Sequence, residues 1–361
     1  MNVLSDFNKD ARHTPRRSGG YEWWYFDGLS HDEKYGFVII FYEGNPFSTR
    51  YNRALGDSKE PLPSAYPAIS ISIYEEGKPI YYSFTEFDEA DCSFSEEHPH
   101  IQMGAHYMES HQEEDTLVYE ITLAETLASG DQLDGTVKFE SQYSESDLFS
   151  ERSDDEQGHM WNLVQPRAHC KANLNISEPG EEERQIVFEG RGYHDHNNGN
   201  EPMCNEFIDW YWGRIHFDYA TLVYYVMNHH EGERHCAWLL SDDNSTVIET
   251  FDEVSLADKG WTLFGLKAAR KVGLRSERGE VQVQHSRVLD NGPFYQRYQS
   301  DAFLRLADEE IVEKKQGICE YIYPNRIYSR IFWPFVDMRI RYKKEKPHWV
   351  QRSKRLYRWT W

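Results

Sequence analysis

Apolar and polar residues alternate along most of this chain. In residues 67–84, Ile69, Ile71 and Ile73 alternate with small or polar residues, and the segment Glu-Glu-Gly-Lys then leads into an aromatic run. Side chains two positions apart share one face of a β-strand, and a Gly-containing turn between two such runs is typical of a hairpin. The pattern therefore predicts a β-hairpin over these residues.

The same period of two recurs through the sequence. Residues 168–177 and 184–196 flank the polar tip EPGEEE, which predicts a second hairpin. Further strands are predicted at residues 116–125, 135–143, 208–217, 220–230, 235–243, 280–289 and 292–306. Short strands with turn signals at this spacing favour an all-β protein built from antiparallel sandwiches or barrels. Only residues 255–271 and 324–340 have patterns that allow a helix.

A change in composition suggests two domains. The segment NNGNEPMCN at residues 197–205 interrupts the strand pattern, and aromatic strands restart after it. We therefore expect an N-terminal β domain at residues 1–200 and a C-terminal β domain at residues 201–361. The acidic stretch at residues 144–158 is predicted to be a solvated loop inside the first domain.

Composition narrows the class of protein. The net charge of the 361-residue chain is −22, which argues against nucleic acid as a partner, because nucleic acid binding needs a basic surface. Aromatic residues make up 15% of the chain, and such residues line pockets for large apolar ligands. The five cysteines are scattered without a C-x-x-C pair, and no signal peptide or spanning segment is recognisable. We therefore expect a soluble, cytoplasmic protein with reduced thiols.

The segment EGRGYHDHNNG at residues 189–199 is the most unusual in the sequence. On a strand, Tyr193 and Asp195 project from one face, while His194 and His196 project from the other. By the same spacing, His159 and Trp161 share a face of the strand that begins at GHMWNLVQP. A carboxylate, an imidazole, a phenol and an indole around one cavity would form a proton donor with an aromatic lining.

Simpler interpretations of these residues remain open. The carboxylate of Asp195 could serve only to accept backbone N–H groups at the end of a sheet, and Trp161 could be a core residue. His194 and His196, spaced H-x-H, would form a three-histidine zinc site if His159 joined them. We expect no metal at the site.

Five motifs together resemble one family. YEWWYFDG, MWNLVQPRA, GRGYHDHNNG, DWYWGRIH and GPFYQRY resemble the acyclic carotenoid 1,2-hydratases, also called hydroxyneurosporene synthases, and the resemblance runs from about Tyr21 to about Met338. It implies two lipocalin-like β units with a ligand cavity, in agreement with the strand pattern. The superfamily is also similar to tocopherol cyclases and to the decalin-forming Diels–Alderases of fungal polyketide pathways, so one scaffold hosts several reactions.

The resemblance implies a cofactor-independent hydratase that adds water to a terminal C=C bond of an acyclic carotenoid or related isoprenoid. The implied catalytic residues are His159, Trp161, Tyr193 and Asp195. We expect burial to raise the pKa of Asp195, so that the carboxyl keeps its proton and protonates the alkene. Trp161 and Tyr193 would then face the carbocation, and His159 would orient the water and take its proton. The side chains expected to bind substrate are Trp24, His194, His196, Trp210 and Trp212.

Two alternatives belong to other functional classes. A cyclase or pericyclase on the same scaffold would capture the cation with an internal double bond, whereas a non-enzymatic lipocalin-like carrier would only bind an apolar isoprenoid or polyene. The presence or absence of water in the product separates the hydratase from the cyclase.

The C-terminal segment differs in charge from the rest of the chain. RYKKEKPHWVQRSKRLYRWTW combines seven Lys and Arg residues after position 342 with three tryptophans. Basic and aromatic residues together suit the interface of an anionic membrane, which favours peripheral association with the inner membrane. The alternative is a final edge strand kept soluble by its charges.

Overall fold

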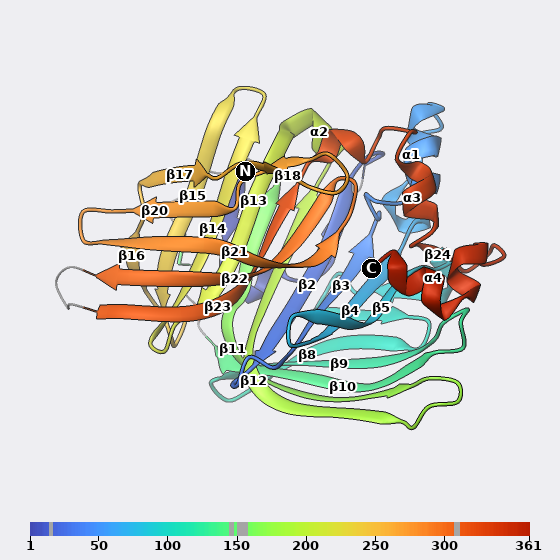
Figure 1. The fold of residues 1–361 in the computed structure, drawn as a ribbon, viewed down its shortest axis with the longest axis horizontal. Helices are drawn as coiled ribbons and strands as arrows, with labels where there is room; N and C mark the ends of the chain where they lie inside the picture. The colour runs from blue at the N-terminus through green and yellow to red at the C-terminus, as the bar shows by residue number, and fades with distance from the viewer. Residues whose placement is uncertain (14–16, 144–147, 150–157, 307–310) are drawn as a thin grey trace. The chain divides into compact units, whose positions relative to one another are not determined.

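In a computed structural model, the protein divides into two compact units (Figure 1). The structure describes residues 1–13, 17–143, 148–149, 158–306 and 311–361. The first unit comprises Met1–Pro202 together with Arg330–Trp361, and the second comprises Met203–Ser329. The sequence analysis assigned residues 330–361 to the second domain, but in the structure they belong to the first unit. The acidic loop predicted at residues 144–158 lies almost entirely outside the described residues.

The first unit is built on a curled 13-stranded sheet. Its strands are β1 (Asn2–Leu4), β2 (Tyr21–Ser30), β3 (Tyr35–Glu43), β4 (Ala68–Glu75), β5 (Lys78–Glu86), β6 (Cys92–Phe94), β7 (His100–Met103), β8 (His106–Glu113), β9 (Thr116–Thr126), β10 (Gln132–Gln142), β11 (Met160–Ser177), β12 (Arg184–Gly199) and β24 (Arg341–Tyr342). Its helices are η1 (Phe7–Lys9), α1 (Thr49–Gly56), η2 (Pro63–Ala65), η3 (Glu89–Asp91), α3 (Trp333–Asp337), η5 (Trp349–Arg352) and α4 (Lys354–Trp359).

The order of the strands brings β2 and β11 to the two sides of β12. The sheet runs β24-β5-β4-β3-β2-β12-β11-β10-β9-β8-β7-β6, and β1 pairs separately with β11. The pairings are antiparallel except for β1 with β11 and β24 with β5, which are parallel. The predicted hairpins form as β4–β5 and β11–β12. In the first turn, Glu76 and Gly77 both have positive φ, 49° and 70°, which is the geometry of a type I′ turn.

The strands of the first unit differ in how they are buried. In β9 the predicted inward residues, from Leu117 to Leu123, lie in the core, and Glu120 and Thr122 between them are exposed. In β2 and β3, by contrast, nearly every residue on both faces is buried. Polar side chains on β2 and on the adjoining end of β12 are therefore enclosed, and each needs a polar partner.

The second unit is built on a nine-stranded antiparallel sheet of order β16-β15-β14-β13-β23-β22-β21-β20-β17, with a separate β18–β19 hairpin. Its elements are α2 (Met203–Glu206), β13 (Phe207–His216), β14 (Ala220–His229), β15 (Gly232–Ser241), β16 (Val247–Thr250), β17 (Glu253–Ala257), β18 (Gly260–Trp261), β19 (Lys267–Ala268), β20 (Lys271–Arg275), β21 (Gly279–Asn291), β22 (Tyr295–Leu306), β23 (Ile311–Ile322) and η4 (Pro324–Arg326). It has its own core, centred on residues such as Leu222, Leu239 and Val283. The all-β prediction is confirmed.

The helix predictions were right in one place and wrong in another. Residues 324–340 contain η4 and α3, but residues 255–271 form β17, β18 and β19 instead of a helix. Gly265, at φ 69°, makes the turn between β18 and β19, and β17 pairs with β20 along its whole length. The helix α1 was not predicted; Ser48 caps its N-terminus by accepting from the backbone N–H of Tyr51. Within the described residues, no helix has the length and apolar character needed to cross a bilayer.

Candidate active site

The carboxyl group of Asp195 lies at the centre of a buried hydrogen-bond network on one face of β12. Only 3% of Asp195 is exposed. Its Oδ2 accepts from the indole Nε1 of Trp161 at 2.8 Å and from the hydroxyl of Tyr193 at 2.7 Å. Its Oδ1 accepts from Nδ2 of Asn197 at 2.9 Å. Three donors therefore converge on one carboxyl group, where each would stabilise negative charge.

The network continues from Asn197 to His159 and Tyr21. Because Nδ2 of Asn197 donates to Asp195, its Oδ1 accepts, and it lies 3.1 Å from Nε2 of His159. An acceptor at this distance places the hydrogen of the neutral imidazole on Nε2. The other nitrogen, Nδ1, then accepts from the hydroxyl of Tyr21 at 3.0 Å. Nδ1 of His159 is therefore the basic atom of this ring.

Strand geometry explains why these side chains meet. Tyr193, Asp195 and Asn197 are two residues apart along β12 and so share a face. Trp161 of β11 lies directly opposite Asn197 in the antiparallel register. On the other side, Tyr21 lies opposite Gly199, where a Cβ atom would come within 2.5 Å of the Tyr21 ring. The glycine leaves the space in which the Tyr21 ring lies against the strand and reaches His159.

Aromatic side chains of β2 extend the same face. Tyr25 lies opposite Asp195 in the register, and its ring meets that of Tyr193 edge-on with centroids 6.1 Å apart. Its hydroxyl donates to Asp27 at 3.0 Å. The ring centroids of Trp23 and His159 lie 5.7 Å apart. Burial raises the pKa of Tyr193 well above its usual range, so this phenol remains a neutral donor.

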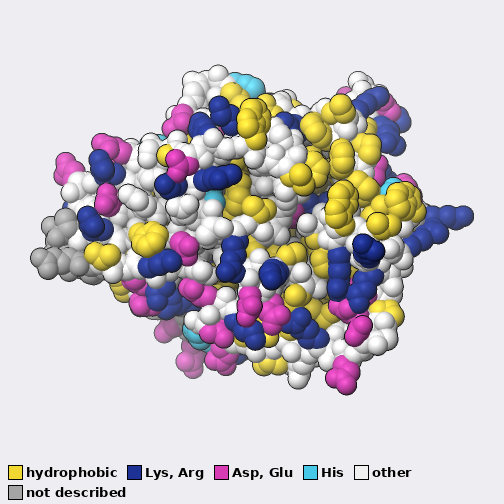
Figure 2. Space-filling model, in the orientation of Figure 1, with side chains coloured by type: hydrophobic (Ala, Val, Ile, Leu, Met, Phe, Trp, Pro, Cys, Tyr) yellow, Lys and Arg dark blue, Asp and Glu magenta, His cyan; other side chains and the backbone are white. Residues whose placement is uncertain are grey.

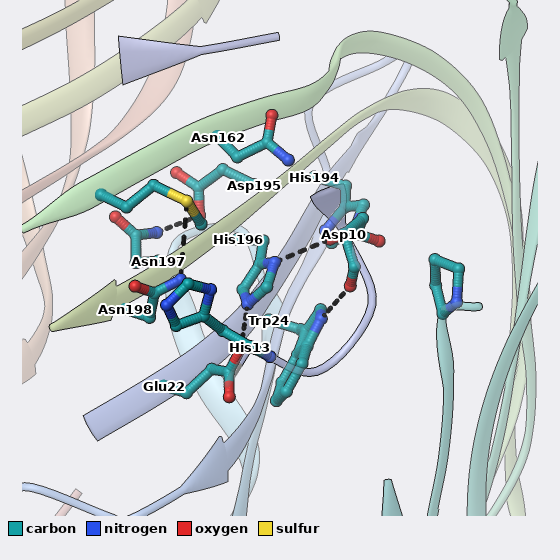
Figure 3. A network of polar contacts seen from close by, with 12 residues as sticks. Asp10, His13, Glu22, Trp24, Asn162, His194, Asp195, His196, Asn197 and Asn198 are labelled. Carbon is teal, nitrogen blue, oxygen red and sulfur yellow. Dashed lines mark hydrogen bonds and ion pairs between the residues drawn. The ribbon is translucent and has the colours of Figure 1, made fainter. Parts of the chain in front are cut away.

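A second polar network occupies the opposite face of β12 (Figure 3). Nε2 of His196 lies 2.8 Å from Glu22, and its Nδ1 lies 3.3 Å from Asp10. Nε2 of His194 lies 3.1 Å from Asp10, and its Nδ1 donates to the backbone carbonyl of Tyr25 at 3.0 Å. The hydroxyl of Tyr119 also donates to Asp10. Both histidines and Asp10 have no exposed surface.

Opposite charges allow this second network to be buried. Burial alone would raise the pKa of Asp10, but the adjacent His194 and His196 outweigh it and lower that pKa to about 2. Burial alone would lower the pKa of His196, but its contacts with Asp10 and Glu22 raise it to about 9. The network therefore contains an ionised carboxylate beside an imidazolium at neutral pH, and the paired charges offset the cost of desolvation.

The structure brings together all four residues proposed as catalytic, but it separates them from three of the residues proposed to bind substrate. Trp24, His194 and His196 lie on the opposite face of the sheet, where Trp24 stacks on His196 with centroids 4.5 Å apart and donates to the backbone carbonyl of Asp10. Trp210 and Trp212 belong to β13 of the second unit, where Trp210 packs against Phe207.

The three-histidine zinc alternative does not form. His159 contacts Tyr21 and Asn197, whereas His194 and His196 project from the other face toward Asp10 and Glu22. Across the part of the chain that the structure describes, no group of three His, Cys, Asp or Glu side chains is arranged to hold a metal ion.

Several residues of the site were not predicted from the sequence. Tyr21, Trp23 and Tyr25 lie within the quoted motif YEWWYFDG, and their period-two spacing places them on one face, so the strand pattern contained that signal. Asn197 continues the spacing of Tyr193 and Asp195. Asp10 follows η1 at the N-terminus, where no periodicity marks it.

The protein thus has a lipocalin-like β fold with a buried carboxyl group that accepts from Trp161, Tyr193 and Asn197. The chain matches the family model of the carotenoid hydratase CrtC over residues 38–348 and belongs to that family. The predicted resemblance is confirmed, and membership places the protein among hydro-lyase enzymes.

Three relatives are similar along most of the chain. A hydroxyneurosporene dehydrogenase of Chlorobaculum tepidum is 30% identical, over 94% of this chain and 92% of that protein. Acyclic carotenoid 1,2-hydratases of Thiocapsa roseopersicina and Rubrivivax gelatinosus are each 26% identical, over 80% and 78% of this chain and 65% of their own lengths.

Solved structures share the fold at low sequence identity. CghA in complex with Sch210972 has a TM-score of 0.60 and 12% identity, over 89% of this chain and 98% of CghA. An AttH-type protein from Nitrosomonas europaea has a TM-score of 0.60 and 14% identity, over 88% of this chain and 96% of that one. These similarities confirm the lipocalin-like architecture.

Proposed function

We propose that this enzyme adds water to a terminal C=C bond of an acyclic carotenoid or related isoprenoid, with Asp195 as the proton donor. The observation that supports this proposal most directly is the convergence of Trp161, Tyr193 and Asn197 on the buried Asp195 carboxyl. Family membership and the names of the hydratase relatives support the type of substrate.

In the first step, the O–H bond of protonated Asp195 breaks and a C–H bond forms at the less substituted alkene carbon. The π electrons supply that bond, which leaves a tertiary carbocation at the other carbon. An alkene is a weak base, so the step needs a strong driving force. The three donors provide part of it, because they stabilise the carboxylate as it forms, and interactions that strengthen toward the transition state accelerate the reaction.

The carbocation is stabilised by the aromatic side chains on the same face. Trp161 and Tyr193 donate to the carboxyl group, and the ring of Tyr25 meets that of Tyr193 edge-on. A cation over an aromatic face gains about 0.5–2 kcal/mol per ring, and more when water is excluded. A ligand cavity on this face of the first sheet is part of the proposal.

Water then adds to the cation and loses a proton toward His159. Since Nδ1 of His159 is held by the Tyr21 hydroxyl, the proton passes from the water to the Tyr21 oxygen as the Tyr21 proton moves to Nδ1. The resting enzyme returns when His159 releases its proton and Asp195 takes one up, so the addition of water leaves no net change in protons. These residues supply the acid and the base themselves, which is the basis for proposing independence from cofactors.

The test is the incorporation of labelled oxygen. Purified protein is incubated with lycopene or neurosporene in detergent micelles in ¹⁸O-labelled water, and the extract is analysed by mass spectrometry. A tertiary alcohol that contains ¹⁸O is the expected product. An unlabelled isomer of the substrate would contradict hydration and identify a cyclase, whereas bound but unconverted polyene would identify a carrier. Unchanged activity after treatment with EDTA and gel filtration is expected if no cofactor takes part.

We also propose that the enzyme associates peripherally with a membrane, because acyclic carotenoids dissolve in lipid and must be collected from it.

A further inference from the structure

The C-terminal segment forms a fixed structure on the first unit. β24 pairs with β5 in parallel, with Arg341 opposite Thr85. Nε2 of Gln351 donates to the carbonyl of Ile340 at 2.9 Å, and the hydroxyl of Tyr357 donates to that of Arg339 at 3.1 Å. The predicted alternative of a charged edge strand accounts only for the two residues of β24, since most of the segment that follows is η5 and α4.

Large apolar side chains are exposed on the C-terminal segment and on the residues of and beside α3 that precede it. Figure 2 shows hydrophobic side chains gathered over the region of α3 and α4, with Lys and Arg side chains among and beside them. The exposed apolar residues are Ile331 (73%), Phe335 (38%), Trp349 (65%), Leu356 (39%) and Trp359 (75%). A single exposed apolar residue is ordinary, but five between Ile331 and Trp359 indicate a surface that contacts something apolar.

The seven basic residues after position 342 divide into two groups. Lys344 pairs with Asp88, and Lys354 and Arg358 both pair with Glu178. The other four, all exposed, have no acidic partner within 4 Å among the described residues; they are Lys343, Lys346, Arg352 and Arg355. On a chain of net charge −22, four cations without acidic partners beside exposed tryptophans are a local reversal of charge.

We infer that this C-terminal face, made by α3, η5 and α4, docks the enzyme on an anionic phospholipid surface. Trp349 and Trp359 enter the headgroup region, where indole rings are favoured, and Arg352 and Arg355 lie against lipid phosphates. A purely apolar partner would not account for the cations, and an acidic protein would not account for the exposed tryptophans as well as a lipid interface does. The inference deepens the proposed function, because it assumes a substrate dissolved in lipid.

The experiment measures co-sedimentation of the full-length protein with vesicles of phosphatidylcholine alone or mixed equally with phosphatidylglycerol. Each basic residue near an anionic surface contributes about a fivefold factor in partitioning, so Arg352→Gln with Arg355→Gln should weaken binding roughly 30-fold at low salt. Added salt should weaken wild-type binding. Trp349→Ser with Trp359→Ser should weaken binding and remove most of the fluorescence quenching by brominated lipid.

Matched controls lie on the second unit. Trp261 is 72% exposed and the Arg275 side chain is 66% exposed, so Trp261→Ser and Arg275→Gln remove comparable groups outside the C-terminal face and should leave binding unchanged. Wild-type affinity in both double variants, or equal binding of the wild type to neutral vesicles, would overturn the inference. If the wild type sediments with neither vesicle, the inference is also wrong, and an acidic protein becomes the partner to test.

Turnover in detergent separates this inference from the proposed function. The double variants should hydrate substrate in micelles at the wild-type rate but lose rate when the substrate is supplied in phosphatidylglycerol vesicles. Vesicle binding without hydration in either form would contradict the function and leave the docking face standing.

Discussion

Trp161 and Asp195 are joined by a buried hydrogen bond, in which the indole Nε1 donates to the carboxyl Oδ2 over 2.8 Å. The bond orients the carboxyl group and places an aromatic ring beside it. It also favours the carboxylate that proton transfer produces, because a hydrogen bond to a charged acceptor is stronger than one to a neutral acceptor.

Replacement of the acid should remove turnover while preserving the fold. Asp195→Asn has no proton to give to an alkene, and a positioned general acid contributes about 10²–10⁴ in rate. The hydration rate should fall at least about 10²-fold, with substrate binding nearly unchanged. Asp131→Asn is the control, since Asp131 is a buried carboxyl group in the segment between β9 and β10. A rate within a few-fold of wild type for Asp195→Asn would rule out its role as the acid.

The indole N–H should matter separately from the indole ring. Trp161→Phe keeps an aromatic face but removes the donor, and hydrogen bonds to charged groups contribute about 1.5–3 kcal/mol. The expected loss in kcat is about 10- to 100-fold, with little change in KM, because the bond strengthens in the transition state. Trp161→Leu should cost more, as it also removes the ring. Equal rates for the two variants would show that the ring contributes nothing.

Gly199 should be required for the position of Tyr21. Gly199→Ala places a methyl group within 2.5 Å of the Tyr21 ring and should move its hydroxyl away from His159. We expect a loss in kcat of roughly tenfold, equal to that of Tyr21→Phe, and no further loss when the two are combined. Gly56→Ala is the control, because its Cβ would meet Arg330 at an ordinary 3.7 Å. Additive losses would show that the glycine acts through something other than Tyr21.

The buried ion pairs behind the site should make stability depend on pH. The pKa of His196 is about 9 in the folded protein against 6.5 as its usual value, so its contribution is complete below about pH 6.5 and is lost as pH rises through 9. The pKa of Asp10 is about 2 against 3.8, so its contribution is present above pH 3.8 and is lost as pH falls through 2. Between pH 6.5 and 9.5, the unfolding free energy should fall by up to roughly 3 kcal/mol.

Urea unfolding at a series of pH values measures this loss. His196→Gln should be less stable than wild type at pH 6 and should lose much less stability between pH 6.5 and 9.5. Parallel curves for the two proteins would show that His196 is not the group that titrates.

The period of two identified strands with one exposed face, such as β9, and also strands buried on both faces, such as β4 and β14. In β9, exposed and buried residues alternate, so the period of two is visible. The helix α1 was missed because TRYNRALG is short and mixes polar and apolar residues. The error at residues 255–271 has a different cause: apolar residues such as Leu256 and Trp261 are spaced irregularly there, and only pairing with other strands decides the structure.

At the site, the sequence predicted what one strand can determine. Tyr193 and Asp195 share a face because of their spacing alone. The meeting of Trp161 with Asp195 depends on the register between β11 and β12, which shifts between Asn162 and Gln165 and cannot be read from either strand. The contact of Asp10 with His194 joins residues 184 positions apart, so no local pattern predicts it.

Because β24 pairs with β5, the first unit can be completed only after the second unit has been synthesised. Since β24 follows the whole second unit in the chain, the ribosome must make residues 203–329 before the strand that borders β5 exists. Until then, a nascent first unit presents β5 without its strand partner at Thr85 and Glu86, and an unpaired strand edge is a place where other chains can pair. Release of a chain shortened before Arg341 would leave Thr85 and Glu86 permanently without this partner.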